Sequence, residues 1–190
     1  LELVHRLDRE TSGCLLVSQR RSALRALHAQ MRAGQIGKRY LALLTGPLLR
    51  AVVEVRLPLK KNQMQGGERM VQVDAQEGKP ARTLFRRLRA FGDCTLVEVE
   101  LDTGRTHQIR VHAASLGAPV AGDDKYGDAE ANRHLRALGL KRLFLHAASL
   151  AFEPPGKSDG QPGGEAHGRI RVEAPLPEEL EAVLERLTET

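Results

Sequence analysis

The sequence predicts an α+β domain with a mixed, mostly antiparallel central β-sheet flanked by helices. Predicted strands outnumber predicted helices, and most successive strands are joined by turn signals rather than by a helix. In one strand-like segment, Val97, Val99 and Leu101 alternate with two glutamates, which is the pattern of a strand with one solvated face. The chain has 190 residues, 41% of them apolar, so it can form one substantial core. We therefore expect a single domain over residues 1–190.

Eight segments have the apolar, β-branched or alternating composition of strands. In chain order they are residues 1–4, 14–18, 38–44, 52–57, 83–88, 95–101, 143–152 and 169–173. The polar stretch 61–80 contains two adjacent glycines and predicts a long hairpin or a flexible arm. Residues 154–168 include eight glycines or prolines, so we expect a mobile surface loop there.

Three helices are predicted from capping residues and a 3.6-residue apolar period. The first extends from Ser22, as its cap, to about Arg32, and a glycine two residues later is its stop signal. The second covers residues 106–116 and also ends at a glycine. The third begins at Pro177. Its apolar positions share one face: Leu180, Val183, Leu184 and Leu187.

The composition favours a nucleic-acid partner and argues against several other classes of protein. The net charge of +5 and the recurring arginine clusters suit a polyanion. Cys14 and Cys94 form no CxxC pair, so we expect no disulfide and a reducing, cytoplasmic location. No apolar run approaches the ~18 residues that span a bilayer, so we expect no membrane partner. Because Leu1 shortly precedes the most polar motif, we expect a fragment of a longer protein.

The most informative motif is HRLDRETSG, residues 5–13, with Asp8 at its centre. The carboxylate lies between Arg6 and a Thr-Ser-Gly turn, and an apolar strand-like run follows immediately. This arrangement displays a charged side chain on a tight loop at the start of a strand. A fold seldom needs such a side chain for its own stability, whereas a nucleophile or a general base requires one.

A second polar segment, residues 101–127, follows a strand and enters a predicted helix. On that helix His107 and Arg110 lie about one turn apart. The opposite, core-facing side has Ile109, Ala113 and Leu116. We therefore expect Arg110 to be held off the core on a rigid element, from which its planar fork could pair bidentately with Asp8. Such a pair is worth ~4 kcal/mol of Coulomb energy at about 4 Å and an effective dielectric of 20, and would keep Asp8 ionised.

Tyr40 is the third candidate, because the chain has only two tyrosines and four phenylalanines. It follows two basic residues at the start of an apolar strand. One interpretation is a strand tyrosine with its ring in the core. The other is a flat surface for a nucleobase, worth ~1–3 kcal/mol per stacked base.

Blander interpretations of these residues stay open. Arg110 could be a solvated helix residue, and Asp123-Asp124 could be a simple turn. Four histidines could be structural hydrogen-bonding groups: His5, His107, His112 and His146. A metal-dependent hydrolase could use His5, Asp8, His107, His112 and the two aspartates, but the spacing lacks HExxH or a thiol cluster, and we expect no metal site. A non-catalytic RNA-binding module is the other alternative, although it has no use for a carboxylate in an anionic groove.

Four segments together resemble motifs of the pseudouridine synthases, in particular the RluA-type branch that modifies ribosomal RNA. HRLDRETSG (5–13) resembles the catalytic-aspartate motif, and KRY (38–40) lies in a segment that resembles the tyrosine motif. GRTHQIRVH (104–112) resembles the arginine motif, and RLFLHAASL (142–150) matches a further strand. The resemblance covers nearly the whole chain and implies the pseudouridine synthase fold. We expect the S4-like RNA-binding domain that usually precedes this catalytic domain to be missing from the chain.

The resemblance implies conversion of specific uridines to pseudouridine in large-subunit (23S) ribosomal RNA, by base flipping and by cleaving and rejoining the glycosidic bond. It implies no cofactor, since nothing is oxidised and no atom is gained. Asp8 would be catalytic, Arg110 would orient it, and Tyr40 would stack on the base or remove a proton. Whether Asp8 adds to the sugar, adds to the base or removes a sugar proton stays open. RNA contacts are implied for Arg6, Lys38, Arg39, Arg105 and His107. We expect a monomer that acts during ribosome assembly.

Overall fold

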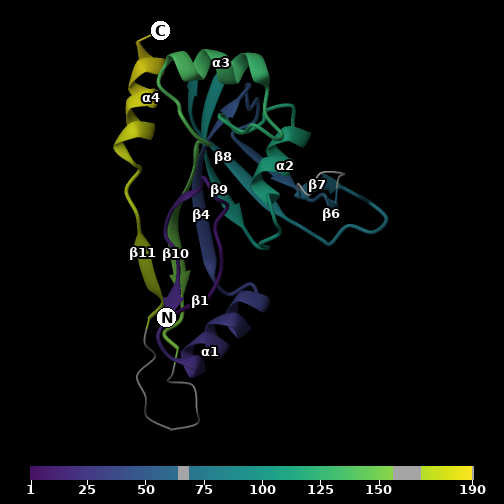
Figure 1. The fold of residues 1–190 in the computed structure, drawn as a ribbon, viewed down its shortest axis with the longest axis vertical. Coiled ribbons are helices and arrows are strands. Elements are labelled where there is room, and N and C mark those ends of the chain that lie inside the picture. The colour runs from purple at the N-terminus through teal and green to yellow at the C-terminus, as the bar shows by residue number, and fades with distance from the viewer. Residues whose placement is uncertain (64–68, 156–167, 190) are drawn as a thin grey trace.

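The computed structural model describes residues 1–63, 69–155 and 168–189. The helices in these ranges are α1 (Arg21–Arg32), α2 (Gln108–Ser115), α3 (Ala129–Ala137) and α4 (Glu178–Thr188). The strands are β1 (Glu2–Leu3), β2 (Ser12–Gly13), β3 (Val17–Ser18), β4 (Gly37–Thr45), β5 (Val52–Val55), β6 (Leu59–Gln63), β7 (Arg69–Val73), β8 (Thr83–Phe91), β9 (Cys94–Leu101), β10 (Leu145–Phe152) and β11 (Ile170–Glu173). Figure 1 shows the long strands running together through the centre of the molecule.

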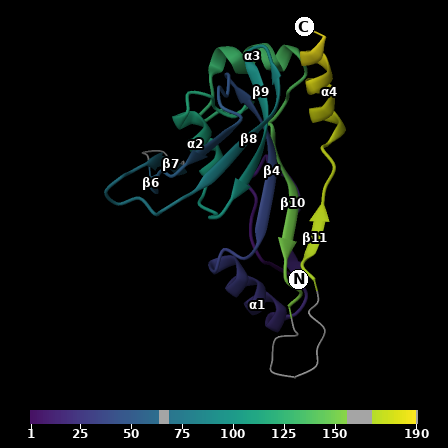
Figure 2. The same cartoon turned by 180° about the vertical axis from the view of Figure 1, so that it is seen from behind.

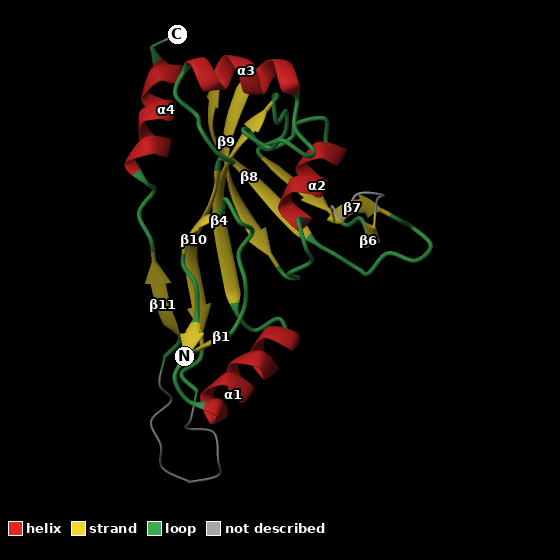
Figure 3. Cartoon of the chain, viewed as in Figure 1, coloured by secondary structure: helices red, strands yellow, loops and turns green. Residues whose placement is uncertain are grey.

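The central sheet has the strand order β11-β10-β4-β9-β8-β5, and β2 also pairs with β10. Its pairings are antiparallel apart from the parallel one between β2 and β10. Two small antiparallel sheets, β1–β3 and β6–β7, lie outside it. Figure 3 separates the yellow sheet from the red helices around it. The predicted α+β class with a mixed, mostly antiparallel sheet is confirmed.

One face of the sheet carries the main hydrophobic core. The register places Tyr40 opposite Val99 and Val99 opposite Phe85, so the three side chains lie on the same face. Helix α2 packs on this face through Ile109 and Ala113. Phe85 and Val99 are fully buried. Complete burial of such a side chain stabilises the fold by about 1.5–3 kcal/mol.

Helices α1, α3 and α4 cover other parts of the sheet. A second core cluster joins Leu43 of β4 and Phe144, which directly precedes β10, to Leu135 of α3 and Leu180 of α4. Helix α1 lies at the opposite end of the long strands, as both views of the molecule show (Figures 1 and 2). There it packs through Leu27 in a third cluster with strand β10. Because α1 and α2 lie apart, the sheet between them is left open.

Several predicted elements are confirmed, and others differ from the prediction. The hairpin predicted in residues 61–80 is present as strands β6 and β7, which begin at Leu59 and end at Val73. Its tip lies outside the described residues, as do positions 156–167 of the predicted loop. Ser22 does not cap α1: the N-cap is Arg20, with no side-chain cap bond. Helix α3 was not predicted, although Asp128 caps it with a side-chain bond to the Ala131 amide.

Two findings bear on the class of protein. Among the described helices, none is both long and apolar enough to cross a membrane. Cys14 and Cys94 are both free thiols, as their spacing predicted.

Candidate active site

A cleft of about 530 Å³ opens on the sheet face between α1 and α2. This volume lies within the usual range of small-ligand sites. Its walls come from the loop after β1, the end of α1, strand β4 and the loop that joins β9 to α2. Seven of the eight predicted site residues line it: Arg6, Asp8, Lys38, Tyr40, Arg105, His107 and Arg110. The structure therefore brings these seven residues together in one cleft, although the contacts inside it differ from those expected.

The Asp8 loop is fixed at its far end by strand β10. Gly13 has φ +109°, and a Cβ there would lie 2.2 Å from the Ala147 carbonyl oxygen, so only glycine fits. The Ser12 hydroxyl bonds to the buried His146 ring at 2.9 Å, and the Thr11 amide donates to the Asp8 carbonyl at 3.0 Å. The loop is thus anchored next to the Asp8 carboxylate, whose side chain keeps 21% of its exposure to solvent.

Arg110 is buried between two carboxylates. Its Nε and Nη2 donate to the two carboxylate oxygens of Asp123, each at 2.7 Å, whereas Nη1 lies 3.5 Å from Asp8 Oδ2. The bidentate partner is therefore Asp123, and the expected bidentate pair with Asp8 is wrong. The expectation that Arg110 lies off the core is also wrong, since its exposed fraction is 8%. Helix α2 is buried on nearly all sides, while Leu116, predicted to face the core, is exposed.

Asp123 is the buried partner of Arg110, a pairing that the sequence did not predict. Its side chain has no solvent exposure, and its Oδ1 also accepts the backbone amides of Lys125 and Tyr126 at 2.9 and 3.1 Å. Burial alone would raise the pKa of Asp123, but Arg110 and these amides hold it below its usual value. Burial likewise opposes the charge of Arg110, and Asp123 outweighs it and raises the pKa of Arg110. Both groups are therefore ionised at neutral pH.

Two glycines close the turn around Asp123 and could have been its signal in the sequence. A Cβ at Gly122 would lie 2.2 Å from the Arg142 carbonyl oxygen, and one at Gly127 would lie 2.1 Å from the Asp123 carbonyl oxygen. The segment GDDKYG is therefore a tightly packed turn rather than a simple surface turn.

Tyr40 lies in the core, as one interpretation of its sequence position predicted, and also reaches the cleft. Its ring belongs to the main core cluster, and the residue also lines the cleft. Burial and then the charge of Asp8 raise the pKa of Tyr40 to about 12, so the phenol is protonated at neutral pH. Within the described ranges, its hydroxyl has no hydrogen-bond partner.

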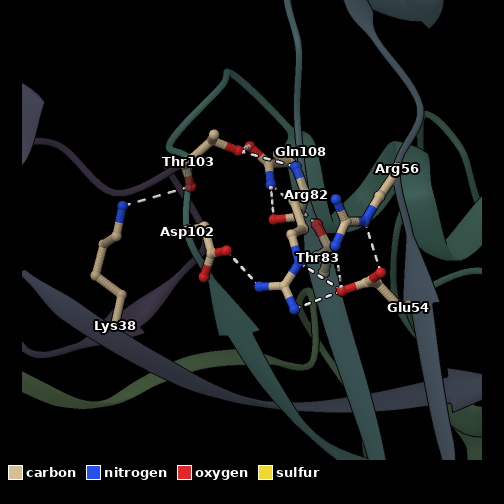
Figure 4. A network of polar contacts seen from close by, with 8 residues as sticks. All are labelled: Lys38, Glu54, Arg56, Arg82, Thr83, Asp102, Thr103 and Gln108. Atoms are coloured by element: carbon tan, nitrogen blue, oxygen red, sulfur yellow. Dashed lines mark hydrogen bonds and ion pairs between the residues drawn. The ribbon is translucent and has the colours of Figure 1, made fainter. Parts of the chain in front are cut away.

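Lys38 and Arg39 are neighbours in β4 and point to opposite faces. Lys38 is buried below the cleft, where its ammonium donates to the Thr103 carbonyl at 3.4 Å (Figure 4). Burial lowers the pKa of Lys38, and Asp102 opposes part of this shift. Arg39 lies on the other face, 3.4 Å from Glu98, so it is the one predicted site residue that does not reach the cleft.

A polar network holds the loop between β9 and α2. Gln108 donates to the Arg82 carbonyl and to the Thr83 hydroxyl, both at 2.9 Å, and accepts from the Thr103 hydroxyl at 2.8 Å. The Arg82 guanidinium bonds to Asp102 on this loop and to Glu54, as Figure 4 shows. Since every polar group of the Gln108 amide is occupied, the network fixes the loop that leads into His107 and Arg110.

His107 was predicted to lie within the helix, but it is the N-cap residue that precedes α2. Its φ of 51° and ψ of 22° are left-handed, and no other non-glycine residue of the described ranges has a positive φ. Such a conformation costs about 1–3 kcal/mol and is often found at functional sites. Burial and then the charge of Arg110 lower the pKa of His107, so the imidazole is neutral at neutral pH.

The two remaining arginines are more exposed. Arg6 lies on the Asp8 loop and is open to solvent, and Arg105 is also exposed while its Nε donates to the Pro80 carbonyl at 3.1 Å. Both line the mouth of the cleft, so it combines cations at its rim with a buried ion pair inside.

Comparisons with known proteins agree with this geometry. The family described as RNA pseudouridylate synthase matches residues 1–115. The chain is 51% identical over 189 residues to Ribosomal large subunit pseudouridine synthase C of Escherichia coli (strain K12), covering 98% of this chain and 56% of that protein. The protein of the same name from Pasteurella multocida (strain Pm70) is 47% identical, covering 100% of this chain and 55% of the relative. The chain thus spans little more than half the length of these relatives.

A solved structure gives the same result for the fold. Human RNA Pseudouridylate Synthase Domain Containing 1 superposes with a TM-score of 0.73 at 26% identity, covering 100% of this chain and 80% of that chain. In the sequence, details such as EGKP (77–80) and DDKYGD (123–128) favour a particular likeness to synthase C. The identities to synthase C from several species confirm that narrower resemblance.

Proposed function

Because this chain belongs to the RNA pseudouridylate synthase family, we propose that it isomerises specific uridines to pseudouridine in large-subunit (23S) ribosomal RNA. The observation that carries the proposal is one cleft lined by Asp8, Tyr40 and Arg110. A carboxylate, a protonated phenol and a guanidinium that meet in one cavity are suited to proton transfer and to stabilising charge on a bound nucleotide.

In this reaction the bond between N1 of uracil and C1′ of ribose breaks, the base turns, and C5 bonds to C1′. We propose Asp8 as the catalytic residue; addition to the sugar, addition to the base and removal of a sugar proton all need an ionised carboxylate. Arg110 supplies the neighbouring positive charge. The buried ring of Tyr40 provides a stacking surface, and its hydroxyl is available for proton transfer at C5. Exclusion of water by the bound RNA prevents hydrolysis of the cleaved sugar.

The target base must leave its helical stack to enter the cleft, which costs a few kcal/mol and less in a loop or bulge. Phosphate contacts from exposed cations can offset this cost. We propose Arg6 and Arg105 for such contacts, and Arg6 for the space left by the flipped nucleotide. Lys38 and His107 would act deeper in the cleft. Arg39 lies on the opposite face and is left out of the proposed set.

The biological setting belongs to the same proposal. We propose that residues 1–190 form one catalytic domain, which acts as a cytoplasmic monomer on ribosomal RNA during ribosome assembly. In the full-length protein an S4-like domain would precede it and help to select the uridines.

The test is to incubate this chain with an unmodified transcript of large-subunit ribosomal RNA and to map pseudouridine by sequencing. Pseudouridine at defined positions, formed equally well with a chelator present, is the expected result. RNA binding without pseudouridine would identify a non-catalytic binding module. Strand cleavage that stops on chelation would identify a metal-dependent hydrolase. Either result would overturn the proposal.

Tyr40→Phe is expected to lower kcat by about 10²-fold or more while RNA affinity stays within about threefold of the wild type. The ring keeps its buried position and its stacking surface, but the hydroxyl that could move a proton is lost. Single-turnover rates with the mapped RNA and a filter-binding titration measure the two quantities. A phenylalanine variant that keeps the full rate would limit Tyr40 to stacking.

A further inference from the structure

Tyr126 links the hairpin β6–β7 to the active-site loop. Its hydroxyl lies 2.8 Å from the Val71 backbone nitrogen in β7 and 2.9 Å from Nδ1 of His107. Its ring also meets the His107 ring edge-on at 5.6 Å and lies 5.1 Å from the Arg110 guanidinium carbon. Figure 1 shows the hairpin and α2 side by side. One phenol therefore contacts the hairpin and two residues that line the cleft, His107 and Arg110.

The hydrogen-bond directions at this phenol determine the protonation of His107. The Val71 amide can only donate, so the Tyr126 oxygen accepts from it. Among the described residues the hydroxyl has no third partner, so its own proton finds an acceptor only in Nδ1 of His107. Nδ1 is then unprotonated, and the proton of the neutral imidazole lies on Nε2.

Nε2–H is left as a donor in the cleft. His107 lines the cleft with Asp8, Tyr40 and Arg110, and no residue of the described ranges accepts a hydrogen bond from Nε2. The left-handed backbone of His107 holds the ring in this place at a cost in strain. The lining of the cleft also includes the Asp8 carboxylate, the Tyr40 phenol and the cations Lys38 and Arg110, so Nε2–H of His107 adds a neutral donor beside these groups.

We propose that His107 donates a hydrogen bond from Nε2–H to an acceptor oxygen of the bound nucleotide, and that Tyr126 is the positioning residue that sets this tautomer. The proposal rests on the proposed function, since it places an RNA nucleotide in the cleft. The acceptor is a uracil carbonyl or a phosphate oxygen, because both present lone pairs to a neutral N–H. His107 thus recognises a hydrogen-bond acceptor of the ligand and not the charge of the ligand.

The tautomer is tested first, in the free protein and without any assay of activity. Two-bond ¹H–¹⁵N correlation spectra of the imidazole rings distinguish Nε2–H from Nδ1–H. His107 should show Nε2–H. His5 is an internal control in the same cleft: its Nε2 accepts from the Leu16 amide at 3.1 Å, so His5 should show Nδ1–H. In Tyr126→Phe, His107 should lose its single tautomer while His5 keeps its own. A wild-type His107 that carries its proton on Nδ1 would overturn the inference.

The contact with the nucleotide is tested by binding to a short RNA that contains a mapped target uridine, and to the same RNA made abasic at that position. His107→Asn removes the Nε2 donor and should weaken binding of the first RNA by about five- to tenfold. His107→Gln retains an amide donor near the position of Nε2 and should stay within about threefold. Tyr126→Phe should weaken binding similarly, and its combination with His107→Asn should add little.

The two RNAs separate the two sources of the acceptor. If the loss in His107→Asn disappears with the abasic RNA, the acceptor is a uracil carbonyl; if it persists, the acceptor is in the RNA backbone. Wild-type affinity of His107→Asn for both RNAs would refute the contact even where pseudouridine still forms. A wild-type chain that forms no pseudouridine would instead count against the proposed function, and the tautomer measurement would be unaffected.

Discussion

Asp8→Asn is expected to lower the rate of pseudouridine formation by at least about 10³-fold, which corresponds to ~4 kcal/mol of transition-state stabilisation. The amide has the size of the carboxylate but cannot act as a nucleophile or a base at neutral pH. RNA affinity should stay the same or increase slightly, because one negative charge leaves a cleft that receives a polyanion. Single-turnover conversion of the mapped RNA and a direct binding titration measure the two effects.

Glu10→Gln is the matched control for this substitution. Glu10 lies two residues from Asp8 on the same loop and is exposed. Glu10→Gln therefore removes a negative charge from the loop without changing a residue that lines the cleft. We expect its rate to stay within about twofold of the wild type, in line with the small effect of most exposed charges. Appreciable turnover by Asp8→Asn, or an equal loss in Glu10→Gln, would remove Asp8 from the chemistry.

The sequence alone predicted which segments meet in the cleft. Asp8, Tyr40 and Arg110 are far apart in the chain, yet each lies in a motif with local order: a tight turn, an alternating strand and a helix start. The alternation of Val97 and Val99 with two glutamates also predicted a strand with one buried face, and the burial of both valines confirms this prediction. These features depend on short-range periodicity, which a single sequence displays directly.

Contacts between distant segments could not be predicted in the same way. Arg110 was assigned to Asp8 because both had been singled out, whereas its closest partner, Asp123, comes from a segment that had been interpreted as a simple turn or as part of a metal site. The helix also begins at Gln108 rather than at residue 106, since His107 adopts the left-handed conformation and shifts which positions are buried. The position of Arg39, in contrast, could have been predicted from the sequence. Side chains alternate between the two faces of a strand, so a cleft-facing Tyr40 places its neighbour Arg39 on the other face.

Asp123→Asn is expected to destabilise the fold by about 3–5 kcal/mol, the usual cost of removing one partner of a buried ion pair. Nε and Nη2 of Arg110 would lose their anionic acceptors, and among the described residues Asp8, at 3.5 Å, would be the carboxylate left beside the guanidinium. Because the guanidinium is then no longer fixed, kcat should also fall by at least about tenfold. Urea denaturation and single-turnover rates, taken where the variant remains folded, measure the two losses.

Asp124→Asn is the matched control, because this neighbour is exposed and pairs with Arg136 on the surface at 2.7 Å. Asp124→Asn should lower the free energy of unfolding by less than about 1 kcal/mol and should leave the single-turnover rate unchanged. If Asp123→Asn and Asp124→Asn destabilise the fold equally, loss of the buried Arg110–Asp123 ion pair would not be the cause of the destabilisation.

The dependence on pH separates loss of the ion pair from loss of packing. The pKa of Asp123 is lower in the folded protein than its value of ~3.9 in an unfolded chain, so its stabilising contribution is complete above about pH 4 and is lost as the pH falls through the folded value. Through the Asp123 carboxyl, the stability difference between the wild type and Asp123→Asn should therefore be constant from pH 5 to 8 and shrink below about pH 4. The titration of His5 and His112, whose pKa values burial lowers, affects both proteins alike and cancels in this difference. His107 would not cancel, because the charge of Asp123 raises its pKa, so both proteins carry His107→Gln in this measurement. A difference that does not change with pH would mean that Asp123 acts through shape and neutral hydrogen bonds, and that Arg110 needs no charged partner to hold its place beside Asp8.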